Sequence, residues 1–143
     1  MADARNYLSL GRKAGRLETG EESCSILLRS GMAKLLVLAS DASDNARRRA
    51  EGFLYGKKTP GVTVPYTKSE ISAATGKNGC SMLAFTDLGL ALSFIRALES
   101  EMPGTYTGVL EQLEQKKQKT ARRAAAAENT VQTKKTGKRR TSE

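Results

Sequence analysis

Three aspartates could supply catalytic or metal-binding carboxylates, because Asp41, Asp44 and Asp87 each follow a short apolar run. In α/β proteins, side chains just beyond the strand ends often line functional sites. Each aspartate also stands where a helix is expected to begin, and an aspartate there caps free backbone amides. Since no phosphate-binding glycine motif accompanies them in the sequence, we expect that the protein is not an enzyme.

The chain contains no histidine. Histidine is the usual proton shuttle at neutral pH and a common metal ligand, so mechanisms that pair Ser or Cys with His are excluded. Cys24 and Cys80 alone cannot build a structural zinc site, which takes four sulfur or nitrogen ligands. Both cysteines lie among apolar residues, which favours packing over reactivity. We therefore expect no catalytic residues, no metal site and no cofactor.

The charge of the chain points to a polyanionic partner. There are 24 Lys and Arg against 15 Asp and Glu, a net charge of +9. Lys and Arg that neutralise phosphates release condensed counterions, which favours binding to nucleic acid. A soluble protein with a merely basic surface would have the same excess. The strongest indications of nucleic-acid binding are the Lys pair 134–135 and the Lys/Arg triplet 138–140, although basic chain ends also keep proteins soluble.

The sequence also predicts where the protein works. It has no recognisable signal peptide, and no apolar run approaches the roughly 20 residues that span a membrane. We therefore expect a monomer in the reducing cytoplasm, with no membrane association.

The composition changes near residues 102–103. Residues 1–100 carry 14 basic and 10 acidic side chains, whereas residues 101–143 carry 10 basic and 5 acidic ones in less than half the length. We predict a folded domain over 1–102 and a basic tail over 103–143. Residues 106–128 have a helical composition with few apolar anchors, and from Asn129 onward we expect disorder.

Helices and short strands alternate along the domain. Two predicted capping boxes, Thr19 with Glu22 and Thr67 with Glu70, each open a helix. Ser40 and Asp41 are N-cap candidates for a third helix. The expected helices are 4–12, 20–30, 42–55 and 67–75, with a last one starting at Asp87.

The expected strands are 16–18, 35–39, 62–66 and 82–85. Residues 35–39 are continuously apolar, which is typical of a strand covered on both faces. Pro65 indicates an edge strand or a strand end. This alternation predicts the α/β class, as a three-layer α/β/α sandwich with a small mixed sheet, plus a basic C-terminal tail.

Four runs of residues resemble a known family. They are NYLSLGRKAGRLETGEES, RSGMAKLLVLASDAS, VPYTKSEISAATGK and LAFTDLGLA, in this order. Together they resemble the ribosomal-protein family that binds kink-turn RNA, which includes ribosomal protein L-seven-Ae, its L-thirty-e relatives and the YlxQ-like bacterial proteins. The match covers residues 5–98 and is closest to the YlxQ-like branch, whereas the tail lies outside it.

The resemblance implies an α/β/α sandwich that binds a sharply bent RNA duplex with tandem G·A pairs. It places the contacts on the start of the second helix and on the loop before the last strand. By position the first region is Thr19, Gly20, Glu21, Glu22, Ser23 and Ile26. The second region is Gly76, Lys77, Asn78, Gly79 and Cys80.

The physical properties of a helix N-terminus are compatible with such an RNA-binding site. A helix N-terminus presents unpaired amides and a partial positive charge, so it can receive a phosphate. Gly20 has no side chain to keep the RNA backbone away. Lys77 and Asn78 can reach phosphate or sugar, and we expect Arg12, Lys13 and Arg16 to flank the same end of the domain.

Two alternatives stay open. Many kink-turn binders carry Lys at the position of Ile26, which we expect either in the core, the favoured interpretation, or as a partly exposed apolar contact. The neighbouring Glu21–Glu22 pair repels phosphate. These departures are compatible with a protein-interaction module of the same fold, and fold alone does not fix function. The favoured function is binding of structured RNA, either kink-turn-like or ribosomal, with association with the ribosome or a translation factor as a further expectation.

Overall fold

The computed structural model describes residues 3–78 and 81–136. It divides into two compact units, Met1–Leu113 and Glu114–Glu143. In chain order the elements are α1 (Arg5–Lys13), β1 (Leu17–Thr19), α2 (Glu21–Arg29), β2 (Leu35–Leu38), α3 (Asp44–Leu54), β3 (Gly61–Thr63), α4 (Lys68–Thr75), β4 (Met82–Phe85), α5 (Leu88–Glu101) and α6 (Thr107–Thr136).

Within the described residues, four strands form one mixed sheet in the order β1-β4-β2-β3. β4 pairs antiparallel with both β1 and β2, and β2 pairs parallel with β3. β1, β2 and β3 therefore run in one direction and β4 in the other. The prediction of a small mixed sheet is confirmed. β3 is an edge strand that ends at Thr63, two residues before Pro65, so it is shorter than the expected strand 62–66.

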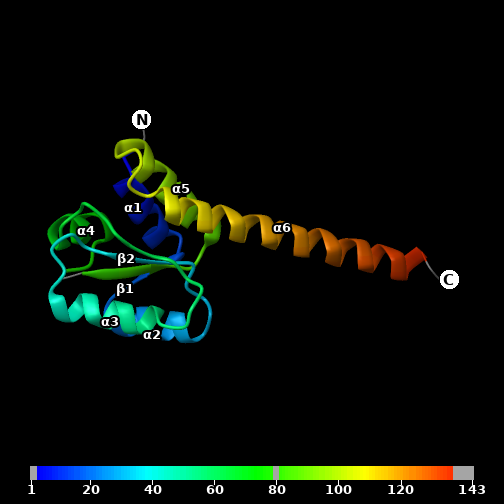
Figure 1. Ribbon diagram of the computed structural model, residues 1–143, viewed down its shortest axis with the longest axis horizontal. Coiled ribbons are helices and arrows are strands. Elements are labelled where there is room, and N and C mark those ends of the chain that lie inside the picture. Colours follow the sequence, from blue (N-terminus) through cyan, green and yellow to red (C-terminus); the bar gives the residue numbers. More distant parts are fainter. Residues whose placement is uncertain (1–2, 79–80, 137–143) are drawn as a thin grey trace. The chain divides into compact units, whose positions relative to one another are not determined.

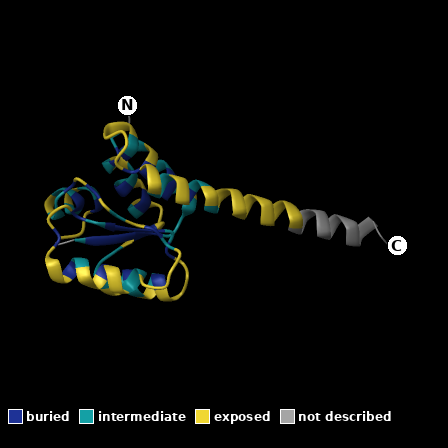
Figure 2. Cartoon of the chain, in the orientation of Figure 1, coloured by how far each residue is buried: buried dark blue, intermediate teal, exposed yellow. Residues whose placement is uncertain are grey.

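Helices cover both faces of this sheet, which makes three layers (Figure 1). α1, α4 and α5 pack on one face, and α2 and α3 on the other. β2 is buried on both sides, since Leu35 and Val37 join one apolar cluster while Leu36 joins the other. The two central strands, β2 and β4, are accordingly among the most deeply buried parts of the domain (Figure 2). This arrangement confirms the α/β/α sandwich.

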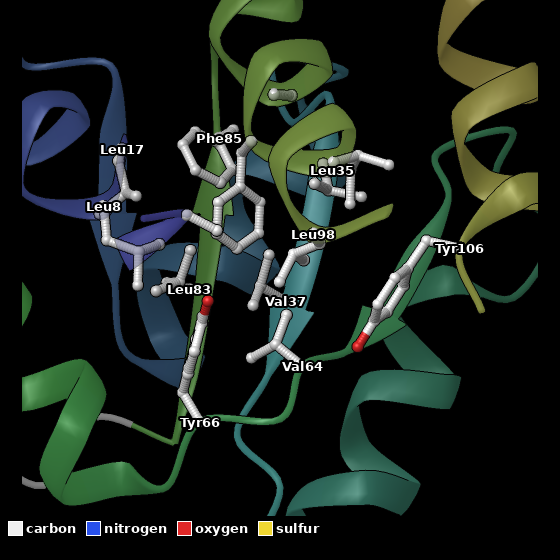
Figure 3. Packing of buried hydrophobic residues seen from close by; sticks show 14 of the residues in the cluster. Leu8, Leu17, Leu35, Val37, Val64, Tyr66, Leu83, Phe85, Leu98 and Tyr106 are labelled. Atoms are coloured by element: carbon white, nitrogen blue, oxygen red, sulfur yellow. The ribbon is translucent and has the colours of Figure 1, made fainter. Parts of the chain in front are cut away.

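The larger apolar cluster lies between the sheet and α1, α4 and α5 (Figure 3). Phe85 of β4 and Phe94 of α5 pack with ring centroids 5.2 Å apart, and both side chains are fully buried. Burying a side chain of this size stabilises the fold by about 1.5–3 kcal/mol. Tyr66 adds a polar contact, because its hydroxyl donates to a carboxylate oxygen of Glu101 at 3.1 Å.

One of the two predicted capping boxes is confirmed and the other is wrong. Thr67 Oγ1 accepts from the amide of Glu70, and the carboxylate of Glu70 accepts from the amide of Thr67. Thr19, by contrast, is the last residue of β1 and lies opposite Leu83 in the sheet. The N-cap of α2 is the next residue, Gly20, which has no side chain that could cap.

The start of α3 also differs from the prediction. Its N-cap is Ser43, whose hydroxyl accepts from the amide of Ala46 at 3.1 Å. Asp41 caps a different helix, because its carboxylate accepts from the amide of Lys68 in the first turn of α4 at 2.8 Å. Asp87 caps α5 as expected, accepting from Leu90. These contacts give Asp41 and Asp87 structural roles.

The compact unit continues to Leu113, beyond the boundary expected at residue 102. Tyr106 and Leu113 are buried in the larger cluster, so the segment after α5 contributes to the core. The carboxylate of Glu99 fixes the turn between α5 and α6. It accepts from the amides of Gly104 and Tyr106, both at 2.7 Å, and from the hydroxyl of Thr107 at 2.8 Å.

α6 runs to Thr136 and thus includes residues 129–136, where the sequence led us to expect disorder. A helical segment rich in alanine, 124–127, precedes them, and alanine has the highest intrinsic helix propensity. The basic triplet 138–140 lies outside the described residues.

Replacing Leu113 by alanine tests whether the core extends past residue 102. Leu113 is fully buried, so we expect Leu113→Ala to lower the free energy of unfolding by about 2–5 kcal/mol. The neighbouring Gln112 is exposed, and Gln112→Ala should change it by less than about 0.5 kcal/mol. Urea denaturation of both variants gives the comparison. Equal, small effects would place the end of the core before α6.

The turn at Glu99 predicts an acid-dependent loss of stability. Hydrogen bonds from the amides of Gly104 and Tyr106, then from Thr107, hold the pKa of Glu99 below its ordinary value of 4.5. A lowered folded-state pKa stabilises the fold above the unfolded pKa, and this contribution disappears as the pH falls below about 4.5 through the folded pKa. We expect Glu99→Gln to be less stable than the wild type at pH 7 and to lose less stability on acidification.

Urea denaturation at pH 7 and pH 3 measures the difference. The control is Glu111→Gln, an exposed position on α6. The same acid dependence in wild type and Glu99→Gln would contradict this assignment.

Candidate nucleic-acid interface

Three helices begin at the same edge of the sheet. Because β1, β2 and β3 are parallel, their carboxyl ends lie side by side, and α2, α3 and α4 start directly after them. The chain returns to this edge through the loop that enters β4. We call this surface, formed by residues 19–26, 39–49, 66–70 and 76–78, the helix-start edge. Each helix N-terminus directs a partial positive charge toward it.

The two regions that the resemblance implied meet here. The amide of Gly20 donates to the carbonyl of Met82, the first residue of β4, at 2.9 Å. The amide of Ala39 donates to the carbonyl of Ser81, also at 2.9 Å. The start of α2 therefore lies beside the end of the loop that begins at Gly76. Gly79 and Cys80 of this loop lie outside the described residues.

A surface hollow with a volume of about 630 Å³ belongs to this edge. Its lining comes from α4 and the following loop: Lys68, Ser69, Ser72, Ala73, Gly76 and Asn78. Gly76 caps α4 in a left-handed conformation, with φ of 78°, and turns the chain so that Lys77 and Asn78 are exposed. Lys68 is a basic residue of this surface that sequence analysis did not select. Its position in the first turn of α4 was the available signal.

Gly20 has a backbone conformation that only glycine adopts readily. Its φ of 102° and ψ of 152° fall in a region that a Cβ atom makes strained. This conformation turns the chain from β1 into α2 with only this one residue between them. It also leaves space where a side chain would be: among the described residues, and apart from the two chain neighbours, no heavy atom would lie within 4 Å of a Cβ atom at this position. The described part of the chain thus leaves room for a ligand beside Gly20.

The first turn of α2 exposes backbone donors. No side chain caps the helix, and the amides of Glu21, Glu22 and Ser23 have no acceptor among the described residues. The starts of α3 and α4 are instead capped by Ser43 and Thr67. Free amides at a helix N-terminus are the groups that bind phosphate and other anions.

The side chains of α2 differ in what they contribute. Glu21 is engaged, because its carboxylate accepts from the Arg49 guanidinium of α3 at 2.9 Å. Glu22 is exposed and Ser23 is half-buried. Ile26, which we expected in the core, is 50% exposed. It lies one turn after Glu22, whereas Cys24 and Leu28 occupy the buried face of the helix.

Arg16 does not lie at this edge, so that prediction is wrong. Arg16 precedes β1 and Gly20 follows it, and its carbonyl accepts from the amide of Thr86 after the far end of β4. The three residues of β1 lie between Arg16 and Gly20, so four residue spacings separate the two by roughly 13 Å. Arg12 and Lys13, at the end of α1, also lie on the Arg16 side. The sequence could not settle this, because it does not give the direction of each strand in the sheet.

The helix-start edge carries equal numbers of acidic and basic side chains. The acidic residues are Glu21, Glu22, Asp41, Asp44 and Glu70, and the basic ones are Arg47, Arg48, Arg49, Lys68 and Lys77. Arg49 is paired with Glu21, and Arg47 donates to the carbonyl of Ser40 at 2.9 Å. Net charge at this edge therefore provides little attraction for a polyanion, and its amides and polar groups remain as the means of recognition.

Potential metal ligands do not cluster within the described residues. Among residues 3–78 and 81–126, no three His, Cys, Asp or Glu side chains come close enough to hold a metal ion. None of the described helices is both long and apolar enough to cross a membrane. Burial and the nearby Glu101 carboxylate raise the pKa of Tyr66, so its hydroxyl stays protonated and donates to Glu101. Cys24 is buried, in agreement with a packing role.

Comparison with known proteins finds relatives for most of the folded domain. No family model matches the chain. The RNA-binding protein YlxQ of Enterococcus faecium is 31% identical over 74 residues, which are 52% of this chain and 71% of that protein. A Bacillus halodurans protein of unknown function has a TM-score of 0.63 and 22% identity, over 69% of this chain and 99% of that one.

The 15.5kD RNA binding protein of Giardia lamblia is a second structural neighbour. It has a TM-score of 0.55 and 15% identity, over 67% of this chain and 84% of its own. At these identities the two solved structures show a shared fold. The sequence relationship rests on the Enterococcus protein.

Substituting Gly20 tests the backbone geometry of the helix start. Because φ is positive there, we expect Gly20→Ala to lower the free energy of unfolding by about 1–3 kcal/mol. Gly52 is the matched control, since it lies within α3 with open space around it, and Gly52→Ala should stabilise the protein by about 0.5–1 kcal/mol. Thermal and urea denaturation measure both changes. A neutral Gly20→Ala would show that this turn tolerates a side chain.

Proposed function

Because the chain belongs to the YlxQ family of RNA-binding proteins, we propose that it binds structured RNA at the helix-start edge. The observation that carries this proposal is the open start of α2, where three amides lack acceptors among the described residues, beside a glycine that leaves room for a ligand. An RNA phosphate supplies the acceptor oxygens that these amides lack.

The arrangement favours a bent RNA over a regular duplex. An A-form helix hides most base edges in a deep, narrow groove, whereas a kink opens the groove and exposes them. Glu22 can accept hydrogen bonds from exposed amino groups of guanine, and Ile26 on the same face offers an apolar contact. Lys77 and Asn78 then reach phosphate or sugar from the neighbouring loop. A kink-turn-like RNA, in ribosomal RNA or elsewhere, is the proposed target.

The basic tail would strengthen this binding without adding specificity. Residues 101–143 carry 10 basic against 5 acidic side chains, whose phosphate contacts would depend on salt but not on sequence. We propose the division of labour expected from the sequence, with the domain recognising the RNA and the tail adding affinity. The protein would act as a cytoplasmic monomer, associated with RNA of the ribosome or the translation machinery, and would not be an enzyme.

One observation favours a second candidate, a protein-interaction module. Ile26 is half exposed beside Glu22, and the edge as a whole carries no excess of positive charge. Such a surface also suits a protein partner with an apolar anchor and a basic rim. Capture of a partner that survives nuclease treatment, and that Ile26→Asp abolishes, would favour this candidate.

RNA titrations of the full chain test the proposal. Two RNAs are compared, a kink-turn with tandem G·A pairs and the same strands with the bulge removed. We expect the bent RNA to bind at least about tenfold more tightly, and binding of both to weaken steeply between about 50 and 200 mM salt. The double variant Lys77→Ala/Asn78→Ala should lose part of the preference for the bent RNA.

Arg96→Ala, an exposed position on α5, is the matched control and should retain that preference. Equal affinity for bent and straight RNA would refute the proposed preference for a kink-turn, but not RNA binding itself. The absence of measurable binding to any structured RNA, or binding that salt does not weaken, would refute the proposed function itself.

A further inference from the structure

The opposite edge of the sheet carries a different set of loops. The connections α1–β1, α2–β2 and α3–β3 lie there, where the three parallel strands begin. We call residues 12–16, 29–34 and 55–60 the basic edge. The resemblance and the proposed function assign no role to this surface.

Its charge is almost entirely of one sign. The three segments contain seven basic and no acidic residues: Arg12, Lys13, Arg16, Arg29, Lys34, Lys57 and Lys58. They are half of the 14 basic residues in positions 1–100. The fourth connection at this edge contains Asp87, whose carboxylate is engaged in capping α5 at the amide of Leu90.

The strand register brings the three segments into one row. Leu17 and Leu35 both lie opposite Phe85, so Arg16 and Lys34, one position earlier, flank the end of β4. The amide of Lys34 donates to the carbonyl of Phe85 at 2.7 Å. The hydroxyl of Thr59 donates to the carbonyl of Ala33 at 3.3 Å, which brings the third segment alongside. At about 4.8 Å per strand, the backbones of Arg16 and Lys34 are roughly 10 Å apart.

These charges form no ion pairs within the described part of the chain, although Arg12, Lys13 and Arg29 lie in the last turns of α1 and α2, where the helix dipole favours a cation. Most of the seven side chains are exposed, and Arg12 and Lys34 are half-buried. Like charges about 10 Å apart repel one another weakly at physiological salt, where the Debye length is about 8 Å, and more strongly at lower salt. A polyanion laid across the row would relieve this repulsion.

An aromatic side chain stands in the same surface. Tyr55, directly after α3, is 87% exposed, and Met32 in the α2–β2 segment is 54% exposed. Lys57 and Lys58 follow Tyr55 by two and three positions. Basic side chains interleaved with an exposed aromatic ring are the means by which proteins hold unpaired nucleotides, because the ring stacks on a base while the cations hold the phosphates.

We propose that the basic edge is a second RNA-binding surface, which holds the phosphate backbone of a strand and stacks an unpaired base on Tyr55. This inference rests on the proposed function, since it concerns another part of the same RNA. The strands separate the two edges by more than roughly 13 Å, so the second surface contacts nucleotides that flank the bend. The helix-start edge then recognises the bend, and the basic edge supplies attraction that the first edge lacks.

Charge-removal variants of the full chain test the electrostatic part. Arg16→Ala/Lys57→Ala/Lys58→Ala removes three exposed charges from the basic edge. Lys117→Ala/Lys119→Ala/Arg122→Ala removes three exposed charges from α6 as the matched control. We expect the basic-edge variant to bind kink-turn RNA at least about tenfold more weakly at about 0.1 M salt. The slope of log affinity against log salt concentration should also decrease by the equivalent of about two to three phosphate contacts. The control should lose less, and both should keep the preference for bent RNA.

Tyr55 tests the stacking part separately. On a kink-turn RNA with an unpaired extension, Tyr55→Ala should weaken binding by about fivefold or more. Tyr55→Phe should restore it, because the ring is retained. On the same RNA without the extension, both variants should match the wild type. Since Tyr55 is exposed, neither change should alter stability.

The outcomes separate this inference from the proposed function. If the wild type prefers bent RNA but the basic-edge and control variants lose affinity equally, net charge alone accounts for the loss and the second surface is refuted. Polyglutamate of matched length that displaces the RNA as effectively as unlabelled RNA would also refute it, because the surface would then accept any polyanion. If the wild type binds no RNA, the proposed function fails first and this inference fails with it.

Discussion

The parallel direction of β1, β2 and β3 sorts the connections of the domain into two sets. All three helices that follow these strands begin at one edge, and all three segments that lead into the strands lie at the other. β4 fits between β1 and β2 in the opposite direction, so that its entering loop joins the helix starts. Two loop regions that are distant in the chain, around Gly20 and Gly76, are brought together by strand direction alone.

Charge is distributed unevenly between these two edges. The helix-start edge balances five acidic against five basic side chains, whereas the three segments of the basic edge carry seven basic side chains and no acidic one. Four of the acidic residues at the first edge, Glu21, Glu22, Asp44 and Glu70, lie in first turns, where a carboxylate is favourable with the helix dipole. Helix stability therefore favours acidic side chains at the same edge that presents the free backbone amides of the helix starts. A polyanion that binds there needs its electrostatic attraction from another surface.

Sequence patterns predicted those parts of the fold that depend on local interactions. The apolar run at 35–39 identified the buried central strand, and Thr67 with Glu70 identified a helix start, because each signal acts within a few residues. The predictions that failed depend on which distant residues come into contact in the folded chain. Thr19 pairs with Leu83 in the sheet, and Ile26 points away from the core that Cys24 and Leu28 enter. Leu113 is buried by a core most of whose residues lie far earlier in the chain. The sequence names such residues but not their partners.

The start of α2 departs from the rule that a helix is capped by its own sequence, and this departure connects stability with binding. Ser43 and Thr67 satisfy amides of α3 and α4 internally, so those helix starts need no ligand. Gly20 provides no side-chain cap, which leaves α2 less well stabilised by roughly a few tenths of a kcal/mol relative to a capped start. The same absence leaves amides and space for an outside acceptor. A bound phosphate would supply the missing cap, so occupancy of this site and stability of α2 are thermodynamically linked.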